Sequence, residues 1–90
     1  MGPVAVLPSD LPKPEVARQV LEFAQKPRRR SQLQERTGMR HAANFLSRYL
    51  TPLLDAGLIE LTMPDSPNAP NQQYRTTNLG MQVLSEWPAD

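Results

Sequence analysis

The sequence contains no cysteine and a single histidine among its 90 residues. Without cysteine there is neither a disulfide framework nor a thiolate metal ligand, and one histidine excludes a zinc finger. The four glycines are scattered along the chain, so they form no glycine-rich phosphate loop. We therefore expect no metal and no cofactor.

Long apolar runs are also missing. No stretch approaches the length that spans a bilayer, and residues 1–8 lack the basic residues and the long apolar segment of a secretory signal. We expect a cytoplasmic protein, or a fragment of one, without a membrane partner. The length predicts one domain with a core of modest size.

Charge is nearly balanced overall, at +1, but it is distributed unevenly. Between Lys26 and Arg48 there are seven lysines and arginines and one acidic residue, Glu35, which gives this segment +6. The remaining residues together carry −5. Positive charge gathered in one segment favours an anionic partner such as nucleic acid.

Residues 40–59, RHAANFLSRYLTPLLDAGLI, have the most informative pattern in the chain. At about 100° per residue, one side of this helix is small or apolar: Ala43, Leu46, Leu50, Leu53, Leu54 and Gly57. The opposite side is polar: His41, Asn44, Arg48 and Asp55. Pro52 lies inside the pattern and predicts a kink near residues 49–51, or a break into two helical pieces.

The first third of the chain predicts a leader and two helices. Residues 1–13 are rich in proline and indicate a flexible leader or linker. A first helix is predicted at residues 15–25. A short second helix follows at residues 32–37, with Ser31 as its N-cap and Gly38 as its closing glycine.

The last third predicts a hairpin and one more helix. Residues 59–63 and 72–76 alternate as strands and are joined by a proline-rich tip at residues 64–71. A closing helix at residues 79–86 follows a Thr-Asn cap, and residues 88–90 form a tail.

This order predicts a mainly α fold with a small β-hairpin, namely a winged helix-turn-helix domain over residues 14–87. It comprises three helices, a two-stranded antiparallel wing and a closing C-terminal helix. On the second strand, Tyr74 is expected to face inward and Arg75 outward.

A second line of inference starts from Pro52–Asp65, which follows the pattern P-L-L-x-x-G-L-I-x-x-T-x-P-D. With its neighbours, over roughly residues 20–84, this segment resembles the C-terminal winged helix of two bacterial groups. One comprises RecG-related ATP-dependent DNA helicases or transcriptional regulators, and the other comprises Fic-type proteins. The resemblance implies an accessory module whose larger protein carries any ATP-binding or nucleotidyl-transfer activity upstream, so we expect no enzymatic activity in this chain.

The polar residues of residues 40–48 predict contacts with double-stranded DNA. Arginine binds guanine edges, asparagine binds adenine, and serine binds phosphate. The arginines before the second helix predict phosphate contacts, because a helix N-terminus favours anions. The predicted DNA-binding residues are Arg28, Arg29, Arg30, Ser31, Arg40, His41, Asn44, Ser47, Arg48 and Arg75. An ordinary solvated surface is the alternative interpretation.

Phe45 and Tyr49 predict a different kind of site. They lie about 140° and 100° from the centre of the apolar helix face. The kink at Pro52 could turn both rings toward the first helix or the leader. If they stay exposed, they form a protein-interaction patch that docks on an upstream domain of the same protein or on a second copy. The tip at residues 64–71 carries Asp65 and no cation, which predicts a rigid turn rather than a minor-groove probe.

Overall fold

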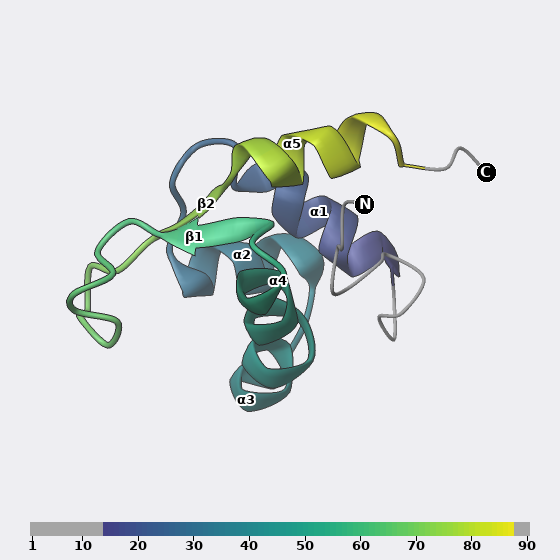
Figure 1. The fold of residues 1–90 in the computed structure, drawn as a ribbon. Coiled ribbons are helices and arrows are strands. Elements are labelled where there is room, and N and C mark those ends of the chain that lie inside the picture. Colours follow the sequence, from purple (N-terminus) through teal and green to yellow (C-terminus); the bar gives the residue numbers. More distant parts are fainter. Residues whose placement is uncertain (1–13, 88–90) are drawn as a thin grey trace.

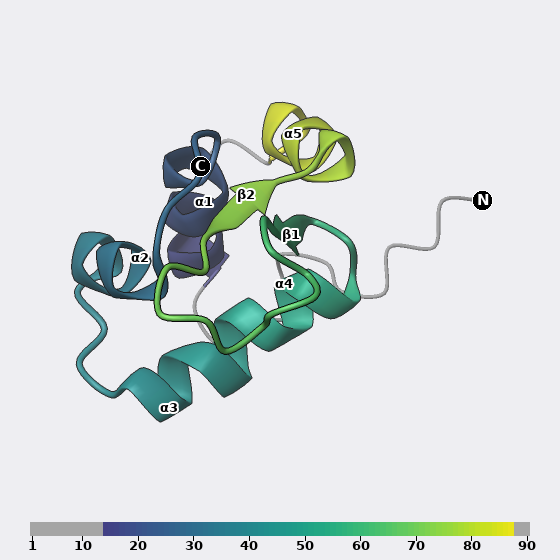
Figure 2. The same cartoon turned by 90° about the vertical axis from the view of Figure 1, so that its left-hand side faces the viewer.

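The computed structural model describes residues 14–87, so the predicted leader at 1–13 and tail at 88–90 lie outside the described residues. The elements in chain order are α1 (Pro14–Phe23), α2 (Arg30–Thr37), α3 (Ala42–Phe45), the π-helical turn η2 (Leu46–Leu50), α4 (Thr51–Asp55), β1 (Ile59–Leu61), β2 (Tyr74–Thr76) and α5 (Asn78–Ser85). Because α3, η2 and α4 run on as one helix, the described part consists of four helices and a two-stranded antiparallel sheet (Figure 2). The predicted winged helix-turn-helix fold is confirmed.

Helix α1 lies at the centre of the domain. Figure 1 shows α5 on one side of it and the α3–α4 helix on the other, with the hairpin projecting sideways. Val16, Val20 and Leu21 are buried along α1 at helical spacing. None of the helices in residues 14–87 combines the length and the apolar character needed to cross a membrane.

Helix α2 begins earlier than predicted. Its N-cap is Arg29, whose backbone N–H donates to Oε1 of Gln32 at 2.8 Å. The prediction of Ser31 as N-cap is therefore wrong, because the side chain that bonds the N-cap backbone belongs to Gln32. The end of the helix was predicted correctly, since Gly38 adopts the left-handed conformation with φ of 74°.

Pro52 is accommodated by the turn before it. The N–H of Thr51 donates to the carbonyl of Leu46, five residues earlier, which widens the helix into a π-turn. A wider turn gives space to the proline ring, which otherwise crowds the carbonyl four residues before it. The predicted irregularity is present at residues 46–50, but the helix is continuous and does not break.

This widened turn changes which side of the helix is buried. Phe45 and Tyr49 lie in the core, with their ring centroids 6.2 Å apart, whereas Ala43 is exposed and Leu46 retains 38% of its accessible surface. The predicted apolar face is therefore wrong upstream of Leu50. A π-turn rotates the chain by fewer degrees per residue than an α-helix does. The side chains before the turn therefore point in a different direction, and Phe45 turns from the flank toward the core.

The hairpin is extended on one edge by the chain before α2. Strands β1 and β2 pair antiparallel with Glu60 opposite Arg75, and the backbone of Arg28 bridges to Tyr74 on the other side of β2. Tyr74 is buried and Arg75 is exposed, as predicted. The N–H of Thr76 donates to the carbonyl of Ala24 at 2.8 Å, which ties β2 to the end of α1.

Gln72 holds the wing together, which the sequence pattern did not indicate. Its side chain is buried, and its Nε2 donates to the carbonyls of Met63 at 2.6 Å and Ser66 at 2.9 Å. Its Oε1 accepts from the N–H of Met63 at 2.9 Å. One amide thus satisfies backbone groups on the opposite side of the tip, where strand pairing has ended.

Replacing Gln72 with leucine is expected to lower the free energy of unfolding by about 2 kcal/mol, because buried backbone groups of the wing lose their partners. Hydrogen exchange at the Met63 amide should accelerate more than exchange in α1. Gln73→Leu serves as the control, because no side-chain hydrogen bond of Gln73 occurs within residues 14–87. Equal exchange rates in the two variants would contradict the role of the Gln72 side chain in holding the wing together.

Candidate nucleic-acid interface

Residues 26–48, called the basic segment below, form no ion pair in the described structure. The two ion pairs within residues 14–87 join Arg18 to Glu22 and Arg75 to Glu60, and both lie outside residues 26–48. Six cations of the segment are exposed: Lys26, Arg29, Arg30, Arg36, Arg40 and Arg48. Uncompensated positive charge on a surface attracts polyanions.

Arg28 differs from the other arginines because the fold uses its side chain. Its Nε donates to the carbonyl of Phe23 at 3.0 Å, and its guanidinium lies 3.9 Å from the centroid of the Phe23 ring. Arg28 therefore joins the end of α1 to β2, and we remove it from the set of DNA contacts.

Arg29, Arg30 and Ser31 remain together at the start of α2, and all three are exposed. The Nη1 of Arg30 donates to Oε1 of Gln34 at 3.2 Å, which directs this side chain along the first turn. The first-turn amides of a helix have no intrahelical acceptor, so this end of α2 is suited to bind an anion.

The polar residues predicted on the next helix are also accessible. All five are exposed: Arg40, His41, Asn44, Ser47 and Arg48. Nε2 of Gln34 donates to the carbonyl of Arg40 at 3.2 Å, which fixes the turn between α2 and α3. His41 is the residue before α3 and makes no side-chain cap. Within residues 14–87 the His41 side chain makes no hydrogen bond.

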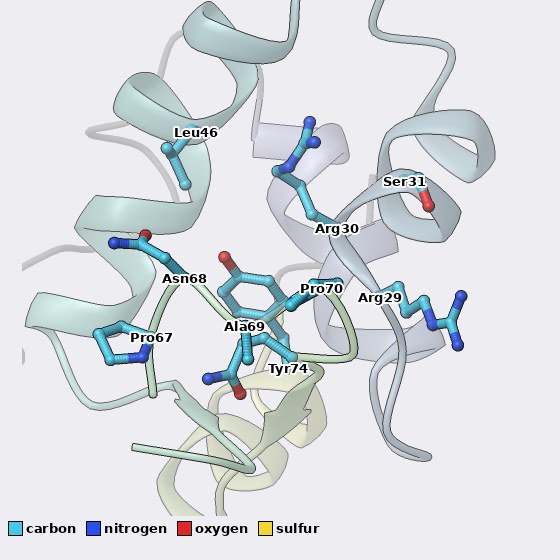
Figure 3. A pocket seen from close by; sticks show the side chains of 10 residues that line it. Arg29, Arg30, Ser31, Leu46, Pro67, Asn68, Ala69, Pro70 and Tyr74 are labelled. Carbon is cyan, nitrogen blue, oxygen red and sulfur yellow. The ribbon is translucent and has the colours of Figure 1, made fainter. Parts of the chain in front are cut away.

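A cleft of about 370 Å³ separates the start of α2 from the wing (Figure 3). Its lining includes Arg29, Arg30 and Ser31 on one side and the tip residues 67–70 on the other. Leu46 adds to it from the long helix, which is the continuous helix formed by α3, η2 and α4. The five exposed polar residues between Arg40 and Arg48, which lie just before α3, in α3 and in η2, are not among the lining residues. The predicted residues therefore form two groups, one at this cleft and one along the helix.

Tyr74 forms the floor of the cleft, a role that sequence reasoning missed. Only 8% of its surface is accessible, and Figure 3 shows its hydroxyl directed into the space near Arg30 and Leu46. Burial raises the pKa of the Tyr74 hydroxyl, and the positive charge of Arg30 partly offsets this effect. Strand alternation predicted an inward ring but carries no information about where its hydroxyl points.

Arg75, the remaining predicted DNA contact, is engaged in an ion pair. Arg75 donates from Nε to Oε2 of Glu60 at 2.9 Å, and it does not line the cleft. Phe45 and Tyr49 are buried, so the inward alternative holds and the two rings form no exposed interaction patch. The widened turn at residues 46–50 is the physical reason, because it rotates both rings into the core.

The helix order, the continuous third helix and the antiparallel wing define a winged helix-turn-helix domain with exposed basic residues in and before α2, before α3 and in η2. Residues 14–77 match the family model described as Filamentation induced by cAMP protein Fic-like, C-terminal domain. Because the match covers most of the chain, this protein belongs to the Fic-like C-terminal domain family.

A solved structure agrees with this assignment. The crystal structure of a Fic family protein from Desulfovibrio desulfuricans G20 is similar to this chain with a TM-score of 0.63 and 33% sequence identity. The similarity covers 70% of this chain and 19% of that protein, so this chain spans a small part of its structural neighbour. No curated protein matches the chain. Nothing supports the RecG-related identity that the sequence also suggested.

Proposed function

We propose that this domain is a duplex DNA-binding accessory module of a larger Fic family protein, and that any catalysis belongs to other domains of that protein. The observation that carries the proposal is the exposed, uncompensated positive charge of residues 26–48. This charge lies on, and directly before, the two helices that winged helix-turn-helix proteins place against DNA.

The two groups of residues have different roles in this proposal. Arg29 and Arg30 contact phosphates and set the position of the domain on the duplex. Asn44 and Arg48 lie on the exposed side of the long helix, Arg40 lies just before its start, and the three contact the groove. The wing contributes shape rather than charge, because its tip carries Asp65 and no cation.

Docking on an upstream domain or on a second copy was the alternative. It was motivated by Phe45 and Tyr49, by the proline-rich leader and by the wing without cations. Exposure of the two rings would favour it, and both side chains are buried. We therefore favour nucleic acid as the partner.

Fluorescence anisotropy with a short duplex of random sequence tests this function. Neutralising three to five phosphates should give a slope of log K against log salt of about −3 to −5. Arg29→Gln, which removes a proposed phosphate contact, is expected to weaken binding to every sequence and to make the slope about one unit shallower.

Arg18→Gln is the matched control, because it removes one exposed positive charge from α1 at a site outside the basic segment. It should leave both affinity and slope unchanged. Absence of binding at low salt, or equal losses in the two variants, would remove the proposal.

A further inference from the structure

The cleft between the start of α2 and the wing contains hydrogen-bond donors without negative charge. Among the described residues that line it, the ionisable and amide side chains are Arg29, Arg30, Asn68, Gln72 and Tyr74, and no aspartate or glutamate is present. A ligand that fits such a lining is an anion that accepts several hydrogen bonds.

Tyr74 is the second feature that points to a ligand. Its side chain is more than nine-tenths buried, and its hydroxyl has no hydrogen-bond partner within residues 14–87. The hydroxyl is directed into the cleft (Figure 3). The hydroxyl itself opens to the cleft, because no buried side-chain polar atom lacks a partner within residues 14–87. A ligand in the cleft can therefore accept a hydrogen bond from it without displacing a protein partner. Because burial raises the pKa of Tyr74, the hydroxyl stays protonated at neutral pH and can donate.

Arg30 supplies the positive charge beside this hydroxyl. In Figure 3 the Arg30 side chain lies above the Tyr74 ring at the upper edge of the cleft, and Ser31 and Arg29 lie to its right. The bond from Arg30 to Gln34 restricts its movement, and the other guanidinium nitrogens make no hydrogen bond within residues 14–87. The eight-residue helix α2 adds its first-turn amides at the same end.

We infer that this cleft binds a phosphate group, with the Arg30 guanidinium and the Tyr74 hydroxyl as donors and the tip residues 67–70 as the outer wall. Phosphate fits better than carboxylate, since a guanidinium fork, a helix N-terminus and a neutral hydroxyl together match its several oxygens. The cleft volume of about 370 Å³ lies at the lower end of ligand pockets, which suits a small group.

The phosphate has two possible sources, the backbone of a duplex and a small phosphate monoester. For the duplex as source, the inference rests on the proposed function, because Arg29 and Arg30 line the cleft and are also the proposed phosphate contacts. The polar residues of the long helix do not line the cleft. Both sources share the same donors, so they are distinguished by experiment.

An amide chemical-shift titration of the whole chain with inorganic phosphate, at constant ionic strength, tests the site. Saturable shifts are expected at Asn68, Ala69 and the first turn of α2. Tyr74→Phe keeps the buried ring and removes only the hydroxyl, so it should weaken phosphate binding about tenfold without changing the thermal midpoint of unfolding. Arg30→Gln should weaken it by at least as much, and Arg18→Gln should not. Unchanged affinity in Tyr74→Phe, or shifts confined to other surfaces, would overturn the inference.

The same variant titrated with duplex DNA identifies the source. Weaker duplex binding by Tyr74→Phe assigns the cleft to a backbone phosphate, whereas unchanged duplex binding assigns it to a phosphate monoester. If phosphate binds in the cleft and the duplex does not bind at all, the proposed function fails alone. If the duplex binds along α3 while phosphate leaves the cleft unshifted, the inference fails alone.

Discussion

Phe45→Ala is expected to lower the free energy of unfolding by about 4 kcal/mol, because it removes a fully buried ring from the centre of the domain. The lost contacts include Tyr49, whose ring centroid lies 6.2 Å away. Chemical denaturation monitored by circular dichroism measures this change, provided that the slope of the transition stays constant.

Leu46→Ala is the matched control for this prediction. Leu46 is the next residue in the same helix and is exposed by 38%, so its truncation should cost less than about 1 kcal/mol. A regular helical period predicts the reverse order, with Leu46 in the core and Phe45 on the flank. If both variants lose the same free energy of unfolding, or if Leu46→Ala loses more, the widened turn at residues 46–50 is contradicted.

Gly80→Ala is expected to destabilise the domain by about 3 kcal/mol, which corresponds to a fall of about 15 °C in the midpoint of thermal unfolding. A Cβ at this position would lie 2.1 Å from the carbonyl oxygen of Leu58 and 2.6 Å from Cγ2 of Thr76. Relief requires α5 to move away from β1 and β2. Such a shift also strains the bond from the Thr77 N–H to the Leu58 carbonyl, which is 3.0 Å long.

Two other glycines provide controls with a different cause of strain. Gly38 and Gly57 have φ of 74° and 76°, but a Cβ on Gly38 meets nothing within 4 Å and one on Gly57 only touches Leu79 at 4.0 Å. Alanine at either position should cost about 1 kcal/mol through backbone strain alone. Gly80→Ala should be clearly worse than both, and a loss no greater than theirs would contradict the close packing of α5.

Local signals predicted the boundaries of several elements. Gly38 and Gly57 end helices because glycine adopts positive φ at low cost. Thr77 caps α5, where its Oγ1 accepts from the N–H of Gly80 at 3.0 Å. Such features depend on neighbouring residues only, so the sequence contains all the information that they need.

The proposed binding surface was only partly predictable. The exposed arginines at residues 29, 30, 40 and 48 follow from a charge pattern that requires no knowledge of the fold. The role of Arg28 does not, because its partner is the Phe23 ring and its backbone pairs with β2. Tyr74 belongs to the cleft because residues 43 positions apart, 31 and 74, line the same cavity.

The sequence by itself determined the order of helices and strands, the position of the wing and the basic character of residues 26–48. These properties depend on composition, on local turns and caps, and on apolar periodicity. Tertiary structure decided which side of the long helix is buried, because the π-turn before Pro52 rotates Phe45 and Tyr49 into the core. It also decided that Gln72 holds the wing and that the Tyr74 hydroxyl opens into the cleft, since both depend on contacts between segments distant in sequence or across the tip.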